Sequence, residues 1–261
     1  MSKIRALNLL VVRAGPTVWD AQGLIAGGAD VPLAHDALLH AKSTFGVLNG
    51  TAKKVAAVVC GPEQASMRIA DLFAAYCGCQ EQPTPKLREV CLGLWEGLPD
   101  QDVAFRYPRM HRQWRTDPTS VLAPGGESWN TAARRVMGEL LAVAARKEDP
   151  YARALLPGGR NPGDSALIGV VVRPWLFGML ASGYIPGYAS NGDPSRVRAL
   201  ATGTQRMCQV RILLDAGRPS LARFIGGDSS DLKTALLTPA AMPNATPTYA
   251  PALAATGTTQ G

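Results

Sequence analysis

The stretch "LLVVRAGPTVWDAQG" (residues 9–23) holds the first residues of this chain that could do chemistry. Its apolar run ends at Arg13, and an arginine at the carboxyl end of a strand is a natural anion ligand because its guanidinium group offers several N–H donors. Gly15 allows the chain to turn sharply directly afterwards. Between them stands Ala14, whose methyl group cannot attack a phosphorus atom. The loop therefore combines an anion-binding turn with an unreactive centre.

Charged side chains stand beside apolar runs at two further places. They are Glu89 in "KLREVCLGLWEG" (86–97) and Arg173 in "GVVVRPWLFGML" (169–180). If the runs before Arg13 and Arg173 form neighbouring parallel strands, both guanidinium groups project at the carboxyl edge of the sheet, where α/β proteins bind their ligands. Two such cations repel each other unless an anion or a carboxylate lies between them. Asp20 and Glu89 are the carboxylates at hand, so the pocket either binds phosphate or neutralises itself.

Short apolar runs alternate with amphipathic stretches along the chain. The pattern predicts strands over 6–12, 55–59, 167–172, 210–214 and 221–225, and helices over 37–48, 66–76, 100–107, 130–146 and 175–182. β-Branched runs separated by helices indicate a three-layer α/β/α sandwich with a mostly parallel sheet. The last two runs, joined by "DAGRPS" (215–220), predict a C-terminal antiparallel hairpin.

The composition is that of one globular domain with a biased C-terminal segment. The chain has 261 residues, 46% hydrophobic and 18% charged, and its apolar runs are far shorter than the roughly 20 residues of a membrane span. Residues 234–261 carry no charged side chain, and 19 of them are Ala, Thr or Pro. We therefore expect one domain over 1–233 and a disordered tail over 234–261, with loops over 148–165 and 183–195.

The cysteine content indicates the cell compartment of the protein, and the net charge indicates the kind of partner that it binds. The five scattered cysteines indicate reduced thiols, and with no signal-peptide pattern we expect a cytoplasmic protein. The close pair Cys77 and Cys79 does not have a usual zinc spacing, so we expect no metal and no cofactor. The formal net charge of +7 favours anionic partners, and no membrane partner is expected. The oligomeric state is left open.

Four segments in sequence order resemble the histidine phosphatase superfamily, which includes the cofactor-dependent phosphoglycerate mutases. They are "VVRAGPTVWDAQGLIAGGADVPL" (11–33), "KLREVCLGLWEG" (86–97), "APGGESWNTAARRV" (123–136) and "RILLDAGRPSLARFIGGDSSDL" (211–232). The resemblance implies a phosphoglycerate mutase-like sandwich over roughly 5–232. It also implies a pocket in which two histidines and two arginines surround a phosphoryl group. In that family one histidine is the nucleophile, and a carboxylic acid protonates the leaving oxygen.

The chain departs from the family pattern where the chemistry is done. By this resemblance Ala14 occupies the nucleophile's position and Arg173 that of the second histidine. Asp20 stands where the family usually has asparagine, and its negative charge opposes phosphate. Ala65 falls where the second core arginine belongs, and Glu89 matches the proton donor. The resemblance therefore implies a phosphoryl-transfer scaffold that has lost its catalytic residues.

Several of these residues can also be interpreted as having a purely structural role. Arg68 lies nearly one helical turn beyond Ala65 and either substitutes for the missing arginine or is a solvated helix residue, which we favour. Glu89 is either a vestigial acid or one half of an ion pair with Arg88 or another neighbour. The segment 126–128 (Gly-Glu-Ser) is interpreted as the start of a helix, because Ser128 is a good N-cap residue.

Three functions remain open. We expect a catalytically degenerate protein that binds a phosphorylated small molecule or a phosphoprotein without turnover. The first alternative is residual phosphatase or phosphomutase activity with Asp20, His35 or Glu89 as an unusual nucleophile. The second is polyanion binding by the segment 105–115, in which four arginines spiral around an expected helix: Arg106, Arg109, Arg112 and Arg115. Its arginine and aromatic mixture makes nucleic acid a minor hypothesis.

Overall fold

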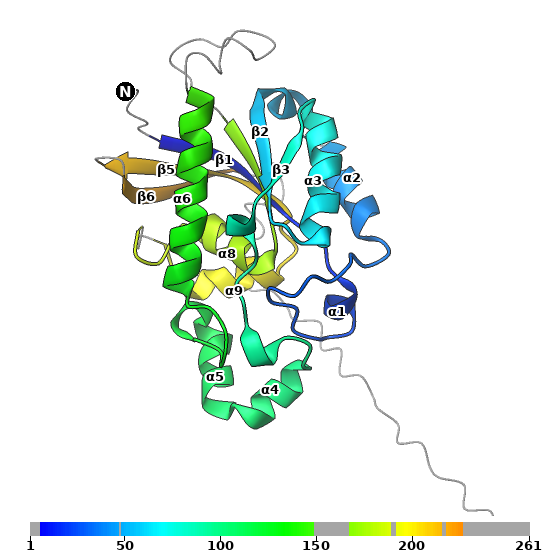
Figure 1. Cartoon of the computed structure of the whole chain (residues 1–261), viewed down its shortest axis with the longest axis vertical. Helices are drawn as coiled ribbons and strands as arrows, with labels where there is room; N and C mark the ends of the chain where they lie inside the picture. Colours follow the sequence, from blue (N-terminus) through cyan, green and yellow to red (C-terminus); the bar gives the residue numbers. More distant parts are fainter. Residues whose placement is uncertain (1–5, 47, 149–166, 189–191, 216–217, 227–261) are drawn as a thin grey trace, which may run out of the picture.

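A single mixed sheet forms the centre of the protein (Figure 1). The computed structural model describes residues 6–46, 48–148, 167–188, 192–215 and 218–226, without the side chains of 49–51, 147–148 and 214–226. Within these residues the strand order is β3-β2-β4-β1-β5-β6. The strands are β1 (Ala6–Arg13), β2 (Val55–Cys60), β3 (Glu81–Pro83), β4 (Leu167–Val172), β5 (Met207–Asp215) and β6 (Arg218–Gly226).

The strand directions confirm the predicted fold class. β3, β2, β4 and β1 run parallel to one another, whereas β5 is antiparallel to β1 and β6 is antiparallel to β5. Every residue of β4, "LIGVVV", is buried, as expected for a central parallel strand covered on both faces. The sheet is therefore mostly parallel with a C-terminal antiparallel hairpin.

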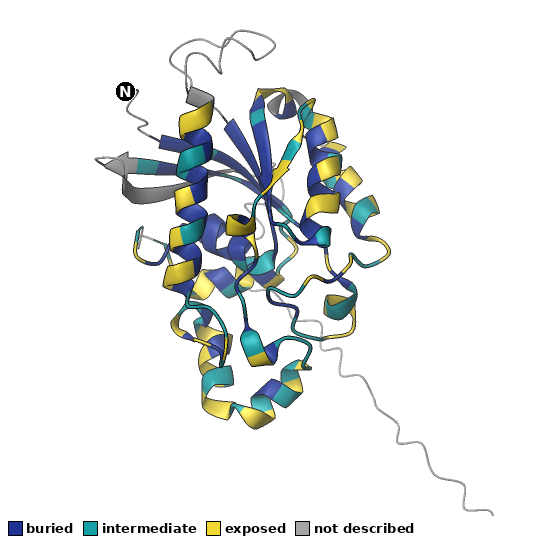
Figure 2. Ribbon diagram, in the orientation of Figure 1, coloured by how far each residue is buried: buried dark blue, intermediate teal, exposed yellow. Residues whose placement is uncertain are grey.

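Helices cover both faces of the sheet and form two separate cores. On one face lie α2 (Ala37–Gly46) and α3 (Gln64–Cys77), which pack through Phe45 and Phe73. On the other lie α6 (Trp129–Glu148), α8 (Pro174–Ser182) and α9 (Ser195–Thr202). The buried stripe of α6 follows the predicted helical spacing (Figure 2). The result is the expected three-layer α/β/α sandwich.

The predicted helix over 100–107 is confirmed as α4, but the four arginines of 105–115, expected to spiral around one helix, are divided between two helices. α4 (Asp100–Arg106) ends before Pro108, which begins α5 (Pro108–Thr116). Proline lacks an N–H group and is favoured at the first position of a helix, so it separates the two. Arg106 therefore lies on a different helix from the other three arginines of this segment, and the prediction of one four-arginine spiral was wrong.

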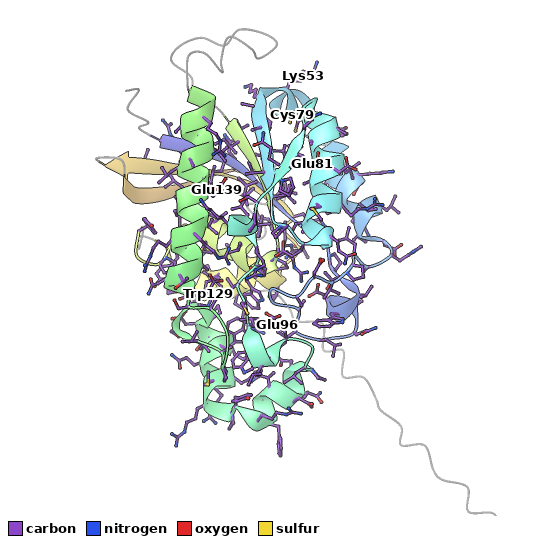
Figure 3. All side chains as sticks on the ribbon, in the orientation of Figure 1. Lys53, Cys79, Glu81, Glu96, Trp129 and Glu139 are labelled. Carbon is purple, nitrogen blue, oxygen red and sulfur yellow. The ribbon has the colours of Figure 1, made fainter. Side chains whose placement is uncertain are left out.

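A cluster of aromatic rings attaches α5 to the sandwich. The ring centroids of Trp114 and Trp175 are 4.5 Å apart, and Trp95 meets Trp114 edge-on at 5.6 Å. Trp129 begins α6 at the end nearest α5 (Figure 3). The four rings unite α5, α6, α8 and the segment 93–95 in one apolar cluster.

Three short elements were not predicted. α1 (Val18–Ala21) has one turn, β3 has three residues and ends in a proline, and α9 starts inside the predicted loop of 183–195. Each is too short for hydrophobic periodicity to be detected. The predicted loop of 148–165, apart from residue 148 at the end of α6, and the boundary between 1–233 and 234–261 lie outside the described residues.

Gly178 permits the close packing of α8 against α9. A Cβ atom at this position would lie 2.3 Å from the carbonyl oxygen of Val197. We expect Gly178→Ala to lower the free energy of unfolding by about 2 kcal/mol, because overpacking forces the backbone apart. Gly138→Ala is the matched control: no atom lies within 4 Å of the added Cβ, so the helix should gain up to about 1 kcal/mol. Urea denaturation of both variants measures the difference, and equal effects would contradict this packing.

Candidate functional site

Arg13 and Arg173 stand at the same edge of the sheet. Arg13 ends β1 and is in register with Val172, the last residue of the parallel neighbour β4. Arg173 follows directly as the N-cap residue of α8. The predicted placement of both arginines at the carboxyl ends of neighbouring parallel strands is confirmed.

Arg173 is a buried cation with unused hydrogen-bond donors. Its residue surface is only 2% exposed, and Nη2 lies 3.8 Å from Oδ2 of Asp20. Nε and Nη1 are buried and have no hydrogen-bond partner among the described residues. Buried polar groups in proteins almost always have a partner, and a buried charge is especially costly without one. Nε and Nη1 therefore carry N–H donors that the described residues do not use.

Asp20 is fixed beside Arg173 by the first turn of α1. Its Oδ2 accepts hydrogen bonds from the backbone N–H of Thr17 at 2.7 Å and from the Thr17 hydroxyl at 2.6 Å. The Thr17 side chain in turn accepts from the backbone N–H of Asp20, which completes a capping box. Asp20 thus has a local structural role and also brings one negative charge to the arginines.

Arg13 is tied to the end of α9. Its Nη1 donates to the carbonyl oxygens of Ala201 at 2.8 Å and Leu200 at 3.3 Å. The guanidinium carbon lies 5.9 Å from the ring centroid of Phe177. Burial, and then repulsion by Arg206, lower the pKa of Arg13 to about 10, while Asp20 acts in the opposite direction. Arg13 therefore has fewer free donors than Arg173.

The neighbour Arg206 was not identified from the sequence. It lines a shallow pocket with Arg13, Gly15 and Thr44 at the end of β1. Its backbone oxygen accepts from the backbone N–H of Arg13 at 2.7 Å. Arg206 directly precedes the antiparallel strand β5, and only its pairing with β1 brings it here.

Glu89 is buried and caps the N-terminus of α8. Its Oε2 accepts from the backbone N–H of Trp175 at 2.7 Å, and its Oε1 accepts from those of Leu176 at 3.0 Å and Val90 at 2.8 Å. Burial raises the pKa of Glu89 to about 7, although these N–H groups and Arg173 favour the charged form. Among the described residues no ion pair joins Glu89 to the exposed Arg88 or to Arg173, and Arg173 acts on Glu89 only as a nearby charge.

Glu63, which was not singled out in the sequence, lies beneath Glu89. It is 2% exposed, and its Oε1 accepts from the backbone N–H of Glu89 at 2.6 Å. Its Oε2 and the hydroxyl of Ser66 are buried without a hydrogen-bond partner in the described part of the chain. Glu63 therefore positions the segment that carries Glu89, and its charge contributes to the raised pKa of Glu89.

Arg68 is not brought to this site by any contact. Its side chain is exposed on α3, and Ala65, which replaces the second core arginine by the resemblance, is fully buried. In the described ranges no hydrogen bond or ion pair joins Arg68 to Arg13 or Arg173. The solvated-helix interpretation fits this placement, and Arg68 is not a built part of the pocket.

None of the three histidines contacts the arginines. His35 and His40 are exposed, and Nε2 of His111 lies 3.0 Å from Oδ1 of Asp100 on α4. Ala14 is buried, and its backbone N–H donates to the carbonyl oxygen of Val172 at 2.8 Å. Within the described ranges no group of His, Cys, Asp and Glu side chains could hold a metal ion.

The segment 126–128 lies at the start of α6, which is the structural role favoured in the sequence analysis. Ser128 accepts from the backbone N–H of Thr131 at 3.2 Å at the start of α6. Glu127 binds Arg135 through two hydrogen bonds of 2.7 Å, and Arg135 also donates to the backbone oxygens of 86, 88 and 89. This network holds the segment of Glu89 against α6.

Fold and site together define a phosphoglycerate mutase-like scaffold, and comparison with known sequences identifies the family. The sequence model of the histidine phosphatase superfamily (branch 1) matches residues 9–152. The chain belongs to this superfamily. No helix in the described part of the chain is long and apolar enough to cross a membrane.

Curated relatives match only in part. The bifunctional protein Rv2228c of Mycobacterium tuberculosis is 39% identical over 82 residues, which are 31% of this chain and 22% of the relative. The probable phosphoglycerate mutase GpmB of Cronobacter sakazakii is 26% identical over 136 residues, 52% of this chain and 62% of the relative. The chain thus spans less than two thirds of either relative.

A solved structure supports the fold over most of the chain. The mycobacterial glucosyl-3-phosphoglycerate phosphatase Rv2419c superposes with a TM-score of 0.65 at 20% identity, covering 87% of this chain and all of that protein. Identity at this level shows a shared fold.

Proposed function

We propose that this protein is a catalytically inactive member of its superfamily that binds an oxyanion of the phosphate type at Arg173. The ligand would be a phosphorylated small molecule or a phosphoprotein. The observation that carries the proposal is the buried guanidinium of Arg173, whose Nε and Nη1 have no partner among the described residues. An oxyanion would supply acceptors to one of these nitrogens together with Nη2, because Nε and Nη1 each form a planar fork with Nη2 and not with each other.

The loss of catalysis is argued from the side chains that replace the family's reactive groups. Ala14 has no nucleophilic atom, and Arg173 does not exchange protons near neutral pH. Glu89 is bound to three backbone N–H groups and is turned toward α8. An acid held in this way stabilises a helix end instead of protonating a leaving group.

The same capping bonds decide which donors remain for a ligand. Glu89 already occupies the N–H groups of Trp175 and Leu176, so the start of α8 offers little to an anion. Arg13 uses Nη1 for the carbonyl oxygens at the end of α9. Arg173 is therefore the principal ligand, and Arg13 contributes charge from the neighbouring strand.

Calorimetric titration with inorganic phosphate at low salt tests anion binding. Wild-type protein should bind weakly, and Arg173→Met should abolish the heat of binding. Arg68→Met is the matched control, because it removes the same charge from an exposed residue on α3 and should leave binding unchanged. Binding that survives in Arg173→Met but is lost in variants of Arg109 and Arg112 would favour the polyanion alternative at α5.

We expect no phosphohistidine intermediate and negligible hydrolysis of p-nitrophenyl phosphate. Loss of a central nucleophile typically lowers the rate by about 10⁴ to 10⁶-fold. Purified protein should stay at the rate of the buffer blank, and no acid-labile phosphoprotein should form with phosphorylated substrates. Turnover that disappears in Asp20→Asn would contradict the proposal and establish the carboxylate beside Arg173 as an unusual nucleophile.

A further inference from the structure

The close cysteine pair Cys77 and Cys79 lies at the C-terminal end of α3, far from the arginines. α3 follows the carboxyl end of β2, runs back along the sheet and contacts the residues Asn49–Lys54 that precede β2 (Figure 1). The pair therefore stands at the edge of the sheet opposite to Arg13 and Arg173, and Figure 3 shows Cys79 at that end of the molecule. Its chemistry is independent of the proposed oxyanion site.

Gly78 sets the distance between the two cysteines. It is the C-cap residue of α3, and its φ of 70° and ψ of 33° lie in the left-handed helical region that glycine adopts without strain. Helical backbone of either hand places Cα atoms two residues apart at about 5.4 Å, as the rise and the radius of the helix require. Disulfides join Cα atoms that are about 4.4 to 6.8 Å apart. The backbone thus holds Cys77 and Cys79 at a separation that a disulfide can span.

Two backbone hydrogen bonds keep Gly78 in this conformation. The N–H of Gly78 donates to the carbonyl oxygen of Ala75 at 3.3 Å, and the N–H of Cys79 donates to that of Ala74 at 3.0 Å. This pair of bonds is the Schellman motif that commonly ends a helix. Ala74 is buried in the core between α3 and the sheet, so the turn that carries the cysteines is anchored to the body of the protein.

The two thiols are in contact with each other and accessible to small molecules. The Cys77 thiol donates a hydrogen bond to Cys79, and this bond, followed by burial, raises the pKa of Cys77. Both side chains are half-buried at the margin of the core. Cys60 and Cys208, by contrast, are fully buried, and burial raises the pKa of both thiols. Contact between thiols and access from solvent therefore coincide at Cys77 and Cys79.

We infer that Cys77 and Cys79 form a redox-active dithiol that closes to a disulfide by exchange with a low-molecular-weight disulfide such as oxidised glutathione. Cys79, which accepts the hydrogen bond, loses its proton and attacks one sulfur of that disulfide, and the first glutathione leaves and takes up a proton. The Cys77 thiol then loses its proton and attacks Sγ of Cys79, which releases the second glutathione as a thiol. In total, two electrons and two protons pass from the cysteines to two glutathione molecules.

Oxidised glutathione, followed by acid quenching, alkylation of the denatured chain and peptide mass mapping, tests the inference on the native protein. In wild-type protein the peptide with both cysteines should lose two hydrogen atoms, escape alkylation and carry no glutathione. Cys77→Ser should stop at the mixed disulfide on Cys79, because the thiol that resolves it is missing. In Cys79→Ser, Cys77 should gain glutathione about tenfold more slowly than Cys79 does in Cys77→Ser, since only the thiolate attacks.

Cys91→Ser is the matched control, because Cys91 is also half-buried but lies outside α3, and this variant should form the disulfide at the wild-type rate. Both single serine variants at the pair leave Gly78 and its backbone hydrogen bonds in place, so the turn itself is unchanged. A wild-type pair that remains open to alkylation, or that carries one glutathione on each cysteine, would overturn the inference. Disulfide formation by Cys77 in Cys79→Ser would overturn it as well, because it would show another partner thiol.

Discussion

Glu89→Ala should lower the free energy of unfolding by about 4 kcal/mol, since it leaves three N–H groups without their acceptor and each such loss costs about 1 to 3 kcal/mol. The donors are the backbone N–H groups of Val90, Trp175 and Leu176. Two of these N–H groups belong to the first turn of α8, and residues 176–182 of this helix are all buried. Denaturant unfolding at mildly acidic pH, monitored by tryptophan fluorescence, measures the effect.

Two further variants separate the capping role from charge and size. Glu89→Gln keeps one side-chain oxygen as an acceptor and should lose only about 1 to 2 kcal/mol. Asp36→Ala removes an exposed acid and should change stability by less than about 0.5 kcal/mol. A Glu89→Ala variant as stable as Asp36→Ala would show that the carboxylate does not hold α8.

The main elements of the fold could be predicted because their signals are local. The β-branched runs of β1, β2 and β4 carry enough buried residues to be recognised, and their alternation with helices predicts a mostly parallel sheet. The resemblance to the histidine phosphatase superfamily, together with the predicted parallel strands, placed Arg13 and Arg173 in one pocket. The predicted helix over 100–107 ends before Pro108, as α4 does, but α5 was not predicted as a separate helix.

The partners of the site residues could not be predicted because they depend on tertiary contacts. The acceptors of the Arg13 guanidinium lie 187 and 188 residues further along the chain, and Glu89 caps a helix 86 residues away. Such distances leave no periodic pattern to detect. One partial signal existed at Thr17 and Asp20, whose spacing of three residues is that of a capping box.

Folding stability should decrease as the pH rises from about 5 to 8. Glu89 has an ordinary pKa of 4.5 and a pKa of about 7 in the folded protein, because burial disfavours its charged form. Between these values the folded state binds a proton that the unfolded state has released. Its contribution is complete below the unfolded pKa and is lost as the pH rises through the folded pKa, with a total of about 3 kcal/mol.

The other described groups with shifted pKa values titrate outside this interval. The pKa of Arg13 is about 10 and that of the Cys60 thiol about 12, whereas the pKa of Asp193 is lowered from 3.8. The fall in stability between pH 5 and 8 is therefore assigned to Glu89. Glu89→Gln, which does not titrate, should have a nearly flat profile over the same range.

Urea unfolding at half-unit pH steps, with wild-type protein and Glu89→Gln in parallel, measures both profiles. The two curves should cross between pH 5 and 8, because the loss of about 3 kcal/mol in the wild type exceeds its advantage of about 1 to 2 kcal/mol over Glu89→Gln at mildly acidic pH. The carboxylate that by resemblance stands at the proton donor's position would then be a proton-holding residue of the core. A wild-type stability that increases from pH 5 to 8, or an equal slope in Glu89→Gln, would show that the buried carboxylate remains charged and is stabilised by Arg173 and its three N–H donors.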